Sequence, residues 1–390
     1  MAYTLAMYAI IFLCLTTTLA MAATDEYYSI VTYGAKADGK TDSSKAFVAA
    51  WEIACGSAKP ATIYVPNGKF YVSKVAFLGP CNNNAIQLRI DGTLVASSDY
   101  SSSLENWLIF EHVNGVTVSG GILDAQGTGL WNCKASGKTC PAGATSLEFT
   151  NSNNITISNL ASVNSQKFHI VINECNNVKI QGVKISAAGN SPNTDGIHVA
   201  GSNSVTILSS KIGTGDDCIS IGPATSNMWV QNVACGPGHG ISIGSLGKVL
   251  EEDGVQNVTV TTSTFTGTQN GVRIKTWGRQ SNSFVKNILF QHVVMVNVEN
   301  PIIIDQNYCP DNNNCPGQES GVKISDVKYQ DIHGSSATEV AVKLDCSKKY
   351  PCSGINLQDI KFTYKNQSAE ASCNNAGGTA SGYLQPASCL

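Results

Sequence analysis

Charged side chains are scarce in this sequence of 390 residues, at 14% of the total, and neither sign dominates. The formal net charge of −3 at pH 7 argues against the broad basic surface that nucleic acids require. Any attraction for a polyanion must therefore be local, and we expect Lys248, Arg273 and Lys275 to supply it. Gly, Ser, Thr and Asn are abundant instead, a composition typical of a β-rich protein with short strands and many turns.

The apolar run near the N-terminus is too short to cross a membrane, because residues 7–19 fall short of the roughly 20 residues that a spanning helix needs. A small-x-small site follows at residues 20–22, which is typical of signal-peptide cleavage. Although no Lys or Arg precedes the run, we predict that residues 1–22 are a signal peptide. We therefore expect a secreted, extracellular protein with no membrane attachment.

The cysteines and histidines lack the paired short spacings of a zinc site, so we expect no bound metal. Of the 14 cysteines, Cys14 lies in the signal segment, and the others predict up to six disulfides in an oxidising compartment. The spacing favours the pairs Cys55 with Cys81, Cys133 with Cys140, Cys218 with Cys235, Cys309 with Cys315, Cys346 with Cys352, and Cys373 with Cys389. Cys175 is left over, and its strand context predicts a buried, unreactive thiol.

Short strands with period-2 alternation recur along the chain, each beginning at a turn residue. From Asn154 to Asn287 their spacing is 23 to 30 residues, and no helical periodicity lies between them. This pattern predicts a right-handed parallel β-helix. A sandwich or barrel is the alternative, but neither would give a fixed period. No segment has a linker composition, so we expect residues 23–390 to form a single domain.

A solenoid needs covered ends, because an open coil exposes core side chains and unpaired backbone groups. A helix is predicted from Asp42 as N-cap, with Phe47, Ala50 and Trp51 on one apolar face together with Ala54. We expect this helix to cap the N-terminal end. The cysteine-rich tail from residue 346 onward is expected to cover the other end.

Four polar motifs, each set in a similar apolar frame, lie at residues 193–198, 215–220, 238–243 and 271–275. Aligned on these frames, one register position holds Asp195, Asp217, His239 and Asn270, and the first three are 22 residues apart. If each repeat is one coil, these side chains stack in space. The sequence therefore predicts one face on which carboxylates and a histidine converge with Arg273.

Asp216 and Asp217 must crowd each other, and their repulsion should raise the pKa of one member, which then carries a proton for general-acid catalysis. Strict alternation would send them to opposite faces, but a bend at Gly215 would let both reach the site. Arg273 and Lys275 should both point outward and hold a substrate carboxylate.

An isolated Asp pair is more often a turn or a calcium ligand, and an isolated His239 is more often structural. Here the co-location of these residues favours catalysis. Thr194, Ser220 and Ser242 are interpreted as solenoid surface residues.

At these residues the chain resembles the polygalacturonases of glycoside hydrolase family 28. The matching motifs are Asn-Thr-Asp at 193–195, Gly-Asp-Asp at 215–217, Gly-His-Gly at 238–240 and Arg-Ile-Lys at 273–275, with further likeness at 33–42 and 305–309. The resemblance implies an inverting hydrolase of α-1,4-linked galacturonan that needs no cofactor. It also implies the following roles: Asp216 as general acid, Asp195 and Asp217 as the carboxylates that activate water, His239 as the group that tunes the acid, Arg273 and Lys275 as ligands of the galacturonate carboxylate, and Asn193 and Tyr308 as cleft residues.

The segment 309–315, Cys-Pro-x-x-x-x-Cys, is most similar to plant pollen exopolygalacturonases, a group that includes allergens. That resemblance implies a monomer that acts on pectic polysaccharide in the plant cell wall, from the non-reducing end. Sequons at Asn154, Asn257 and Asn366 fit a secreted glycoprotein. Endo action, a calcium-dependent pectate lyase, a rhamnogalacturonan hydrolase and a non-catalytic wall-binding β-helix are the alternatives. The Arg-Ile-Lys motif argues against the rhamnogalacturonan hydrolase, and the presence of every motif acid argues against the non-catalytic protein.

Overall fold

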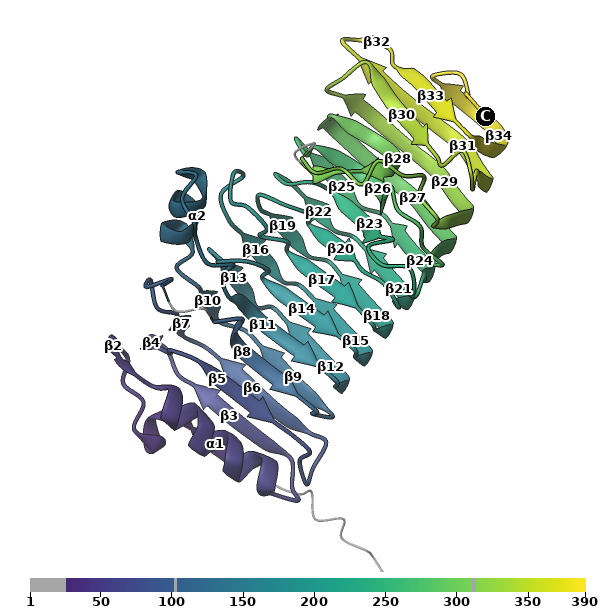
Figure 1. Cartoon of the computed structure of the whole chain (residues 1–390). Coiled ribbons are helices and arrows are strands. Elements are labelled where there is room, and N and C mark those ends of the chain that lie inside the picture. The colour runs from purple at the N-terminus through teal and green to yellow at the C-terminus, as the bar shows by residue number, and fades with distance from the viewer. Residues whose placement is uncertain (1–25, 102–103, 311–312) are drawn as a thin grey trace, which may run out of the picture.

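The computed structural model describes residues 26–101, 104–310 and 313–390, so the predicted signal peptide and Cys14 lie outside the described residues. The chain winds into a stack of coils whose strands run parallel to their neighbours (Figure 1). Most coils contribute one strand to an 11-stranded sheet, here the small sheet, and two strands to a 23-stranded sheet, here the large sheet. This architecture confirms the predicted right-handed parallel β-helix.

The small sheet carries the predicted polar motifs. Its strands, in spatial order, are β5 (Val75–Leu78), β8 (Asn106–Glu111), β11 (Thr145–Thr150), β14 (Ile170–Asn173), β17 (Ile197–Ala200), β20 (Ile219–Ile221), β23 (Ile241–Leu246), β26 (Asn270–Trp277), β28 (Asn300–Tyr308), β30 (Val340–Asp345) and β33 (Glu370–Asn374). Sequence order and spatial order agree, so neighbouring coils in the sequence are neighbours in space.

The large sheet forms the other faces of the solenoid. Its strands are β1 (Glu26–Ser29), β2 (Asp38–Asp42), β3 (Ala61–Val65), β4 (Lys69–Tyr71), β6 (Ile86–Ile90), β7 (Thr93–Val95), β9 (Val116–Ser119), β10 (Ile122–Asp124), β12 (Asn153–Ser158), β13 (Ala161–Val163), β15 (Asn176–Gln181), β16 (Lys184–Ser186), β18 (Asn203–Leu208), β19 (Lys211–Gly213), β21 (Ser226–Gln231), β22 (Ala234–Cys235), β24 (Val255–Thr261), β25 (Thr264–Thr266), β27 (Phe284–Val298), β29 (Lys323–Ser336), β31 (Cys352–Tyr364), β32 (Gln367–Ser368) and β34 (Ala376–Gln385). β32 is antiparallel to β31, in contrast to the parallel pairing of the coils.

The register of the small sheet is the one that the apolar frames predict. Ile197 pairs with Ile219, Ile219 with Ile241, and Ile241 with Val272. The inward side chains of successive coils therefore stack and exclude water from the interior. In the N-terminal coils this stack is aromatic, since the rings of Phe77, Phe110 and Phe149 follow one another at centroid distances of 4.3 and 4.5 Å.

A ladder of asparagine side chains runs along the first residues of one row of strands in the large sheet. Asn177 Nδ2 donates to Asn154 Oδ1 at 2.6 Å, and Asn257 Nδ2 donates to Asn227 Oδ1 at 3.0 Å. These residues have positive φ, from 55° to 57°, a conformation that Asn tolerates better than most residues. Two of the sequon asparagines, Asn154 and Asn257, belong to this ladder. The ladder hydrogen-bonds the strand starts of neighbouring coils to one another.

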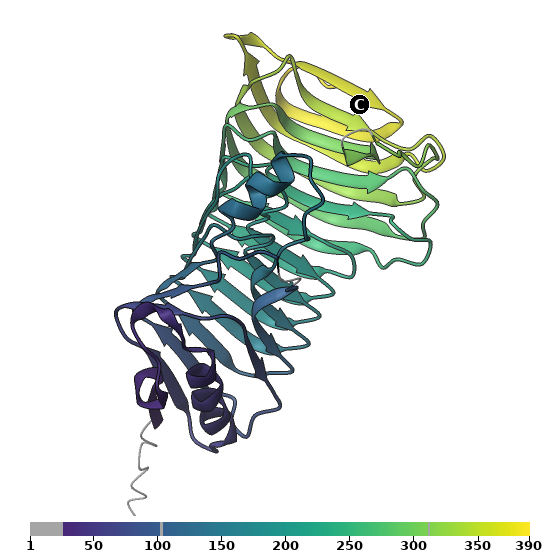
Figure 2. The same cartoon turned by 60° about the vertical axis from the view of Figure 1, so that its left-hand side comes forward.

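The N-terminal end is covered as predicted, by α1 (Ser44–Gly56), which lies across the first coils (Figure 2). Phe47, Ala50, Trp51 and Ala54 are buried against the coils. The predicted N-cap is one residue early, because Ser43 occupies that position. Asp42 nevertheless serves the helix start, since its Oδ1 accepts the backbone N–H of Ser44 at 3.0 Å.

The C-terminal tail does not form a separate cap. It makes the last coil, in which β33 pairs with β30, and β34 pairs with β31. The end of the chain packs on the core through Leu384 and Leu390. The tail therefore covers the core by continuing the solenoid.

A second helix, α2 (Thr128–Ala135), was not predicted. It projects from the coils near the beginning of the small-sheet strands (Figures 1 and 2). A short 3-10 helix, η1 (Ile30–Tyr33), and α1 precede it in the chain. The indole N–H of Trp131 donates to Ser165 O at 3.0 Å, and the Cys133–Cys140 disulfide closes the segment that follows. Only Leu130 and Trp131 of the helix are buried, so its sequence carries little helical periodicity.

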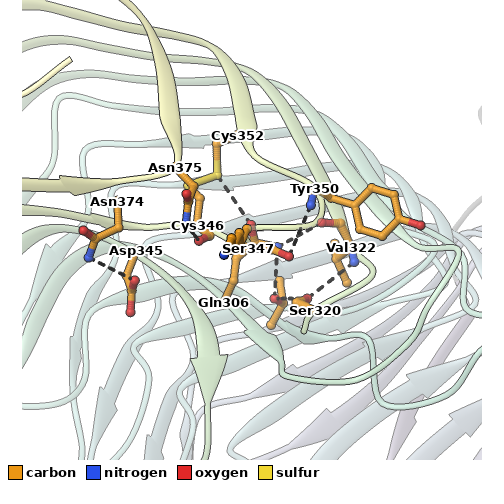
Figure 3. Close-up of a disulfide and its surroundings, with 12 residues drawn as sticks. Gln306, Ser320, Val322, Asp345, Cys346, Ser347, Tyr350, Cys352, Asn374 and Asn375 are labelled. Atoms are coloured by element: carbon orange, nitrogen blue, oxygen red, sulfur yellow. Dashed lines mark hydrogen bonds between the residues drawn. A yellow bond between two sulfur atoms is a disulfide. The ribbon is translucent and has the colours of Figure 1, made fainter. Parts of the chain in front are cut away.

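All six predicted disulfides are present. Among the described cysteines Cys175 is free and buried, as predicted. Burial raises the pKa of its thiol to about 11. Figure 3 shows the Cys346–Cys352 disulfide beside the fully buried amide of Gln306, which accepts the N–H of Ser347 at 3.0 Å. In the described residues no helix has both the length and the apolar character needed to cross a membrane.

Candidate active site

The predicted row of polar residues lies at the end of the small sheet where its strands begin. Backbone hydrogen bonds fix its order, because Gly196 N donates to Asp217 O at 2.9 Å and Cys218 N donates to Gly240 O at 2.7 Å. Asn270 Nδ2 donates to His239 O at 3.1 Å. Asp195, Asp217, His239 and Asn270 therefore occupy equivalent positions on successive coils, as the 22-residue spacing predicts.

Asp216 reaches the same site through a bend. Its Oδ1 accepts the backbone N–H of Asp217 at 2.8 Å and lies 3.1 Å from His239 Nδ1, while Asn193 Nδ2 lies 3.4 Å from its Oδ2. The bend depends on Gly215, since a Cβ at this position would lie 2.1 Å from Ser191 O. The predicted glycine bend is thus confirmed, and it brings together two carboxylates that strand alternation would separate.

Asp217 is almost fully buried, with 1% exposure, and both of its carboxylate oxygens have a donor. Ser242 Oγ donates to Oδ1 and Lys275 Nζ donates to Oδ2, each at 2.7 Å. Burial would lower the pKa of Lys275, but the charge of Asp217 raises it above its ordinary value. This ion pair, made between coils, places an ammonium directly against the Asp217 carboxylate within the site.

The interpretation of Thr194, Ser220 and Ser242 as surface residues was wrong. They are 0%, 3% and 0% exposed, because side chains of adjacent coils cover them. Thr194 Oγ1 accepts the N–H of Gly215 at 3.1 Å and so supports the bend before Asp216. Ser242 binds Asp217 directly, and the hydroxyl of Ser220 lies 2.8 Å from His198 Nδ1.

Asp195 is 6% exposed and shares the site with the other two carboxylates. Burial, and then the charges of Asp216 and Asp217, raise the pKa of Asp195 well above its ordinary value. Burial alone would also raise the pKa of Asp216, but the hydrogen bond and charge of His239 outweigh it and lower that pKa. The raised pKa expected within the Asp216–Asp217 pair is therefore found on Asp195 in the free protein, since His239 stabilises the charged form of Asp216.

Arg273 and Lys275 lie on the C-terminal side of the carboxylates. Both point away from the core as predicted, yet they are only 8% and 7% exposed. The ring of Tyr308 covers them, with its centroid 5.2 Å from Arg273 Cζ and 5.2 Å from Lys275 Nζ. Within the described part of the chain, Arg273 Nε is buried and has no hydrogen-bond partner. A buried donor of this kind is available to an anionic ligand.

Tyr308 reaches this face because β28 contains an extra residue. Lys275 pairs with Asp305, whereas Trp277 pairs with Tyr308, so three residues of β28 match two of β26. The shift changes the alternation and aims Tyr308 outward, beside Trp277. The resemblance placed Tyr308 in the cleft, but strand periodicity alone could not do so.

His198 was missed in the sequence, and it lies at the outward position inside the same apolar frames. It pairs with Ser220, which pairs with Ser242, and this row ends at the predicted Arg273. The ring of His198 stacks on Phe168 at 5.0 Å, and burial lowers its pKa to about 4. The alignment that revealed Asp195 and Asp217 would have revealed this second row as well.

The site offers a possible set of metal ligands, because atoms of Asp216, Asp217 and His239 lie within 4.8 Å of one another. Lys275, however, already places its ammonium on Asp217. A cation bound by all three residues would share Asp217 with this ammonium. The expectation that the protein uses no metal stays a prediction.

This geometry can be compared with that of known proteins. Residues 55–389 match the family described as glycosyl hydrolases family 28. A polygalacturonase from Prunus persica is 67% identical over 366 residues, covering 93% of each chain, and an exopolygalacturonase from Platanus acerifolia is 41% identical over 92% of this chain and 97% of its own. The solved endo-xylogalacturonan hydrolase of Aspergillus tubingensis shares the fold, with a TM-score of 0.80 and 24% identity over 92% of this chain and 100% of its own. The chain therefore belongs to glycosyl hydrolase family 28.

Proposed function

We propose that the protein is a polygalacturonase that hydrolyses α-1,4-galacturonosyl linkages of pectin. The observation that carries this proposal is the arrangement of three carboxylates and a histidine directly beside two buried cations. Hydrolysis of a glycosidic bond requires an acid and a base, and a galacturonate substrate adds a carboxylate that cations can hold. The names of the relatives, polygalacturonase and exopolygalacturonase, support the same substrate.

In the proposed reaction, Asp216 protonates the leaving oxygen, and Asp195 with Asp217 activates the attacking water, with inversion at the anomeric carbon. His239 controls the protonation of Asp216, which it contacts. Arg273 and Lys275 bind the substrate carboxylate, while Asn193 and Tyr308 line the cleft beside them.

Substrate binding allows Asp216 to take up from solvent the proton that it lacks in the free protein. Lys275 is one of the groups that lower the pKa of Asp216, after the contributions of His239. A substrate carboxylate on Arg273 and Lys275 offsets these positive charges and excludes water, so the pKa of Asp216 rises in the complex. The acid then becomes protonated only when the sugar is in place.

We further propose exo action from the non-reducing end, in a single catalytic domain of residues 23–390 that is secreted to the plant cell wall and acts as a monomer on pectic polysaccharide. Exopolygalacturonases among the relatives, at 40% to 43% identity, support the exo mode. The six disulfides support an oxidising, extracellular compartment.

Product analysis on polygalacturonate tests both levels of the proposal. Release of galacturonate monomer alone is expected, and a ladder of oligomers would contradict exo action while preserving the hydrolase. Activity should persist with a chelator, and the products should lack a double bond. Unsaturated products that require calcium would instead indicate a lyase.

A further inference from the structure

A hollow of 530 Å³ lies next to the catalytic row, on its N-terminal side. Its floor is the outer face of β8, β11 and β14, through Asn106, Glu148 and Val171. Its volume lies within the roughly 300–1,000 Å³ of small-ligand sites. The site residues proposed above do not line it.

The hollow is continuous with the catalytic carboxylates through a chain of contacts. Phe168, which lines the hollow, stacks on His198 at 5.0 Å. His198 Nδ1 lies 2.8 Å from Ser220 Oγ, and Ser220 in turn hydrogen-bonds Asp195. Arg273, Lys275 and Tyr308 lie beyond the carboxylates on the C-terminal side. A glycan bound across the carboxylates would thus have one neighbour of the cleaved bond at Arg273 and the other in the hollow.

Lys167 gives the hollow a cation that makes no ion pair within the described residues. Its ammonium lies 4.9 Å from the centroid of the Phe168 ring, and in the described chain it makes no ion pair or side-chain hydrogen bond. Lys275, by contrast, is paired with Asp217. An unpaired ammonium beside an aromatic ring is suited to a sugar that carries a carboxylate, with the ring against the C–H face of the sugar.

The hollow is also lined by two carboxyl groups, those of Glu105 and Glu148. Burial raises the pKa of the Glu148 carboxyl above its ordinary value; the charge of Lys167 acts against this rise, and the charges of Glu105 and Glu111 add to it. At the acidic pH of a plant cell wall, a carboxyl of this kind is increasingly neutral and can donate a hydrogen bond to a sugar oxygen. Glu148 therefore opposes a bound anion less than its formal charge suggests.

A fixed wall closes the hollow on the side of α2. Ala142 and Gly143 form this wall. Lys134 Nζ donates to Ala142 O at 2.9 Å, and a Cβ on Gly143 would lie 2.5 Å from Leu130 of α2. The Cys133–Cys140 disulfide ties the same segment to the helix. A wall held at these points limits how far a glycan extends beyond the hollow.

We propose that this hollow binds the galacturonate unit on the opposite side of the cleaved bond from Arg273, with Lys167 on its carboxylate and Phe168 against its ring. The inference rests on the proposed polygalacturonase function. It assigns α2 and the wall segment the role of limiting the number of sugar units on this side, which favours cleavage near a chain end.

The test compares kcat and KM on trigalacturonate for the wild type and the variants Lys167→Gln, Lys167→Arg and Phe168→Leu. Loss of a charge-assisted contact is expected to raise KM about tenfold in Lys167→Gln. Lys167→Arg should restore most of the affinity, and Phe168→Leu should raise KM less than Lys167→Gln. The matched control is Lys179→Gln, an exposed lysine on β15 of the large sheet, which should leave both constants unchanged.

The outcomes separate the two proposals. An unchanged KM in Lys167→Gln, with a wild type that hydrolyses polygalacturonate, overturns the role of the hollow and leaves the proposed function standing. A wild type that releases no reducing ends overturns the proposed function, and this inference with it. Melting temperatures of all variants within about 2 °C of the wild type establish that the constants report binding rather than unfolding.

Discussion

Two stacks of equivalent residues run along the coils of this β-helix, and they differ in how their polar groups are satisfied. In the asparagine ladder an amide donates to the amide of the preceding coil, as Asn177 does to Asn154, and no charge is involved. In the catalytic row Asp195 and Asp217 stack on neighbouring coils. The charges of Asp216 and Asp217 both act on the carboxyl group of Asp195. The first arrangement satisfies its hydrogen bonds internally, whereas the second depends on Lys275 and His239 for compensation.

The difference shows how the same backbone geometry can contribute either stability or reactivity. A solenoid repeats a position at every coil, so any side chain placed there acquires a neighbour of the same kind. Neutral amides in that position stabilise the stack, whereas carboxylates raise each other's pKa and produce an acid and a base within one site. The fold supplies the repetition, and the choice of side chain determines whether it contributes stability or reactivity.

The largest effect is expected from Asp216→Asn, which removes the proposed acid from the catalytic row. Hydrolysis of polygalacturonate should fall by roughly 100 to 10,000-fold, the usual contribution of acid catalysis. Folding and secretion should be normal, because Asn still accepts the N–H of Asp217. Initial rates and circular dichroism of the purified variant check this. Turnover within tenfold of the wild type would exclude Asp216 as the acid.

Lys275→Ala and Arg273→Ala should differ in stability although both impair activity on galacturonan. Lys275→Ala leaves Asp217 buried without its cation, which costs about 3–5 kcal/mol in comparable buried pairs. Arg273 makes no ion pair in the described residues, so its loss should cost activity with less destabilisation. Urea unfolding and kinetics of both variants give the comparison. If the wild type cleaves a fully methyl-esterified substrate as fast as the free acid, these residues do not bind a substrate carboxylate.

Asp195→Asn should inactivate the enzyme and yet stabilise it at neutral pH. The pKa of Asp195 is raised in the folded state, so its contribution to stability is fully present below its unfolded pKa of about 4 and is lost as pH rises through the folded value. The loss is about 1.4 kcal/mol per unit of the shift. The gain in melting temperature over the wild type should therefore grow from pH 4 to pH 8. If the gain in melting temperature shrinks over this interval, Asp195 is not the residue with the raised pKa.

The smallest effect is expected in the asparagine ladder. Asn177→Gly keeps a residue that tolerates φ of 56° and removes the side-chain hydrogen bond to Asn154. Stability should fall by about 1 kcal/mol, with kcat unchanged, because the ladder does not contact the catalytic row. Thermal unfolding and the rate on polygalacturonate measure both quantities. A loss of activity at full stability would show that the two stacks are coupled.

Much of this fold could be predicted because its signals are local and repeated. The apolar pair Ile219 and Ile221 recurs one coil on as Ile241 and Ile243, and that repetition sets the register of the small sheet. The disulfides followed from short spacings such as Cys346 to Cys352. The position of α2 could not be predicted in the same way, because a short helix outside the coils has little apolar periodicity.

The sequence predicts which residues make up the site, but it does not predict the contacts between them. Spacing placed Asp217 and Lys275 on one face, but their ion pair joins residues 58 positions apart and depends on coil geometry. The bulge that turns Tyr308 outward breaks the alternation from which side-chain direction is inferred. The burial of Ser242 likewise arises from neighbouring coils, which a single repeat does not encode.

The dependence of initial rate on pH, measured on polygalacturonate from pH 3 to 9, tests the shared-proton site most directly. Catalysis needs one aspartate protonated and another ionised, so the rate should be bell-shaped with a maximum at roughly pH 4 to 6. The acid limb reports loss of the base, and the alkaline limb reports loss of the proton from the general acid. A rate that stays at its plateau above pH 8 would contradict the account.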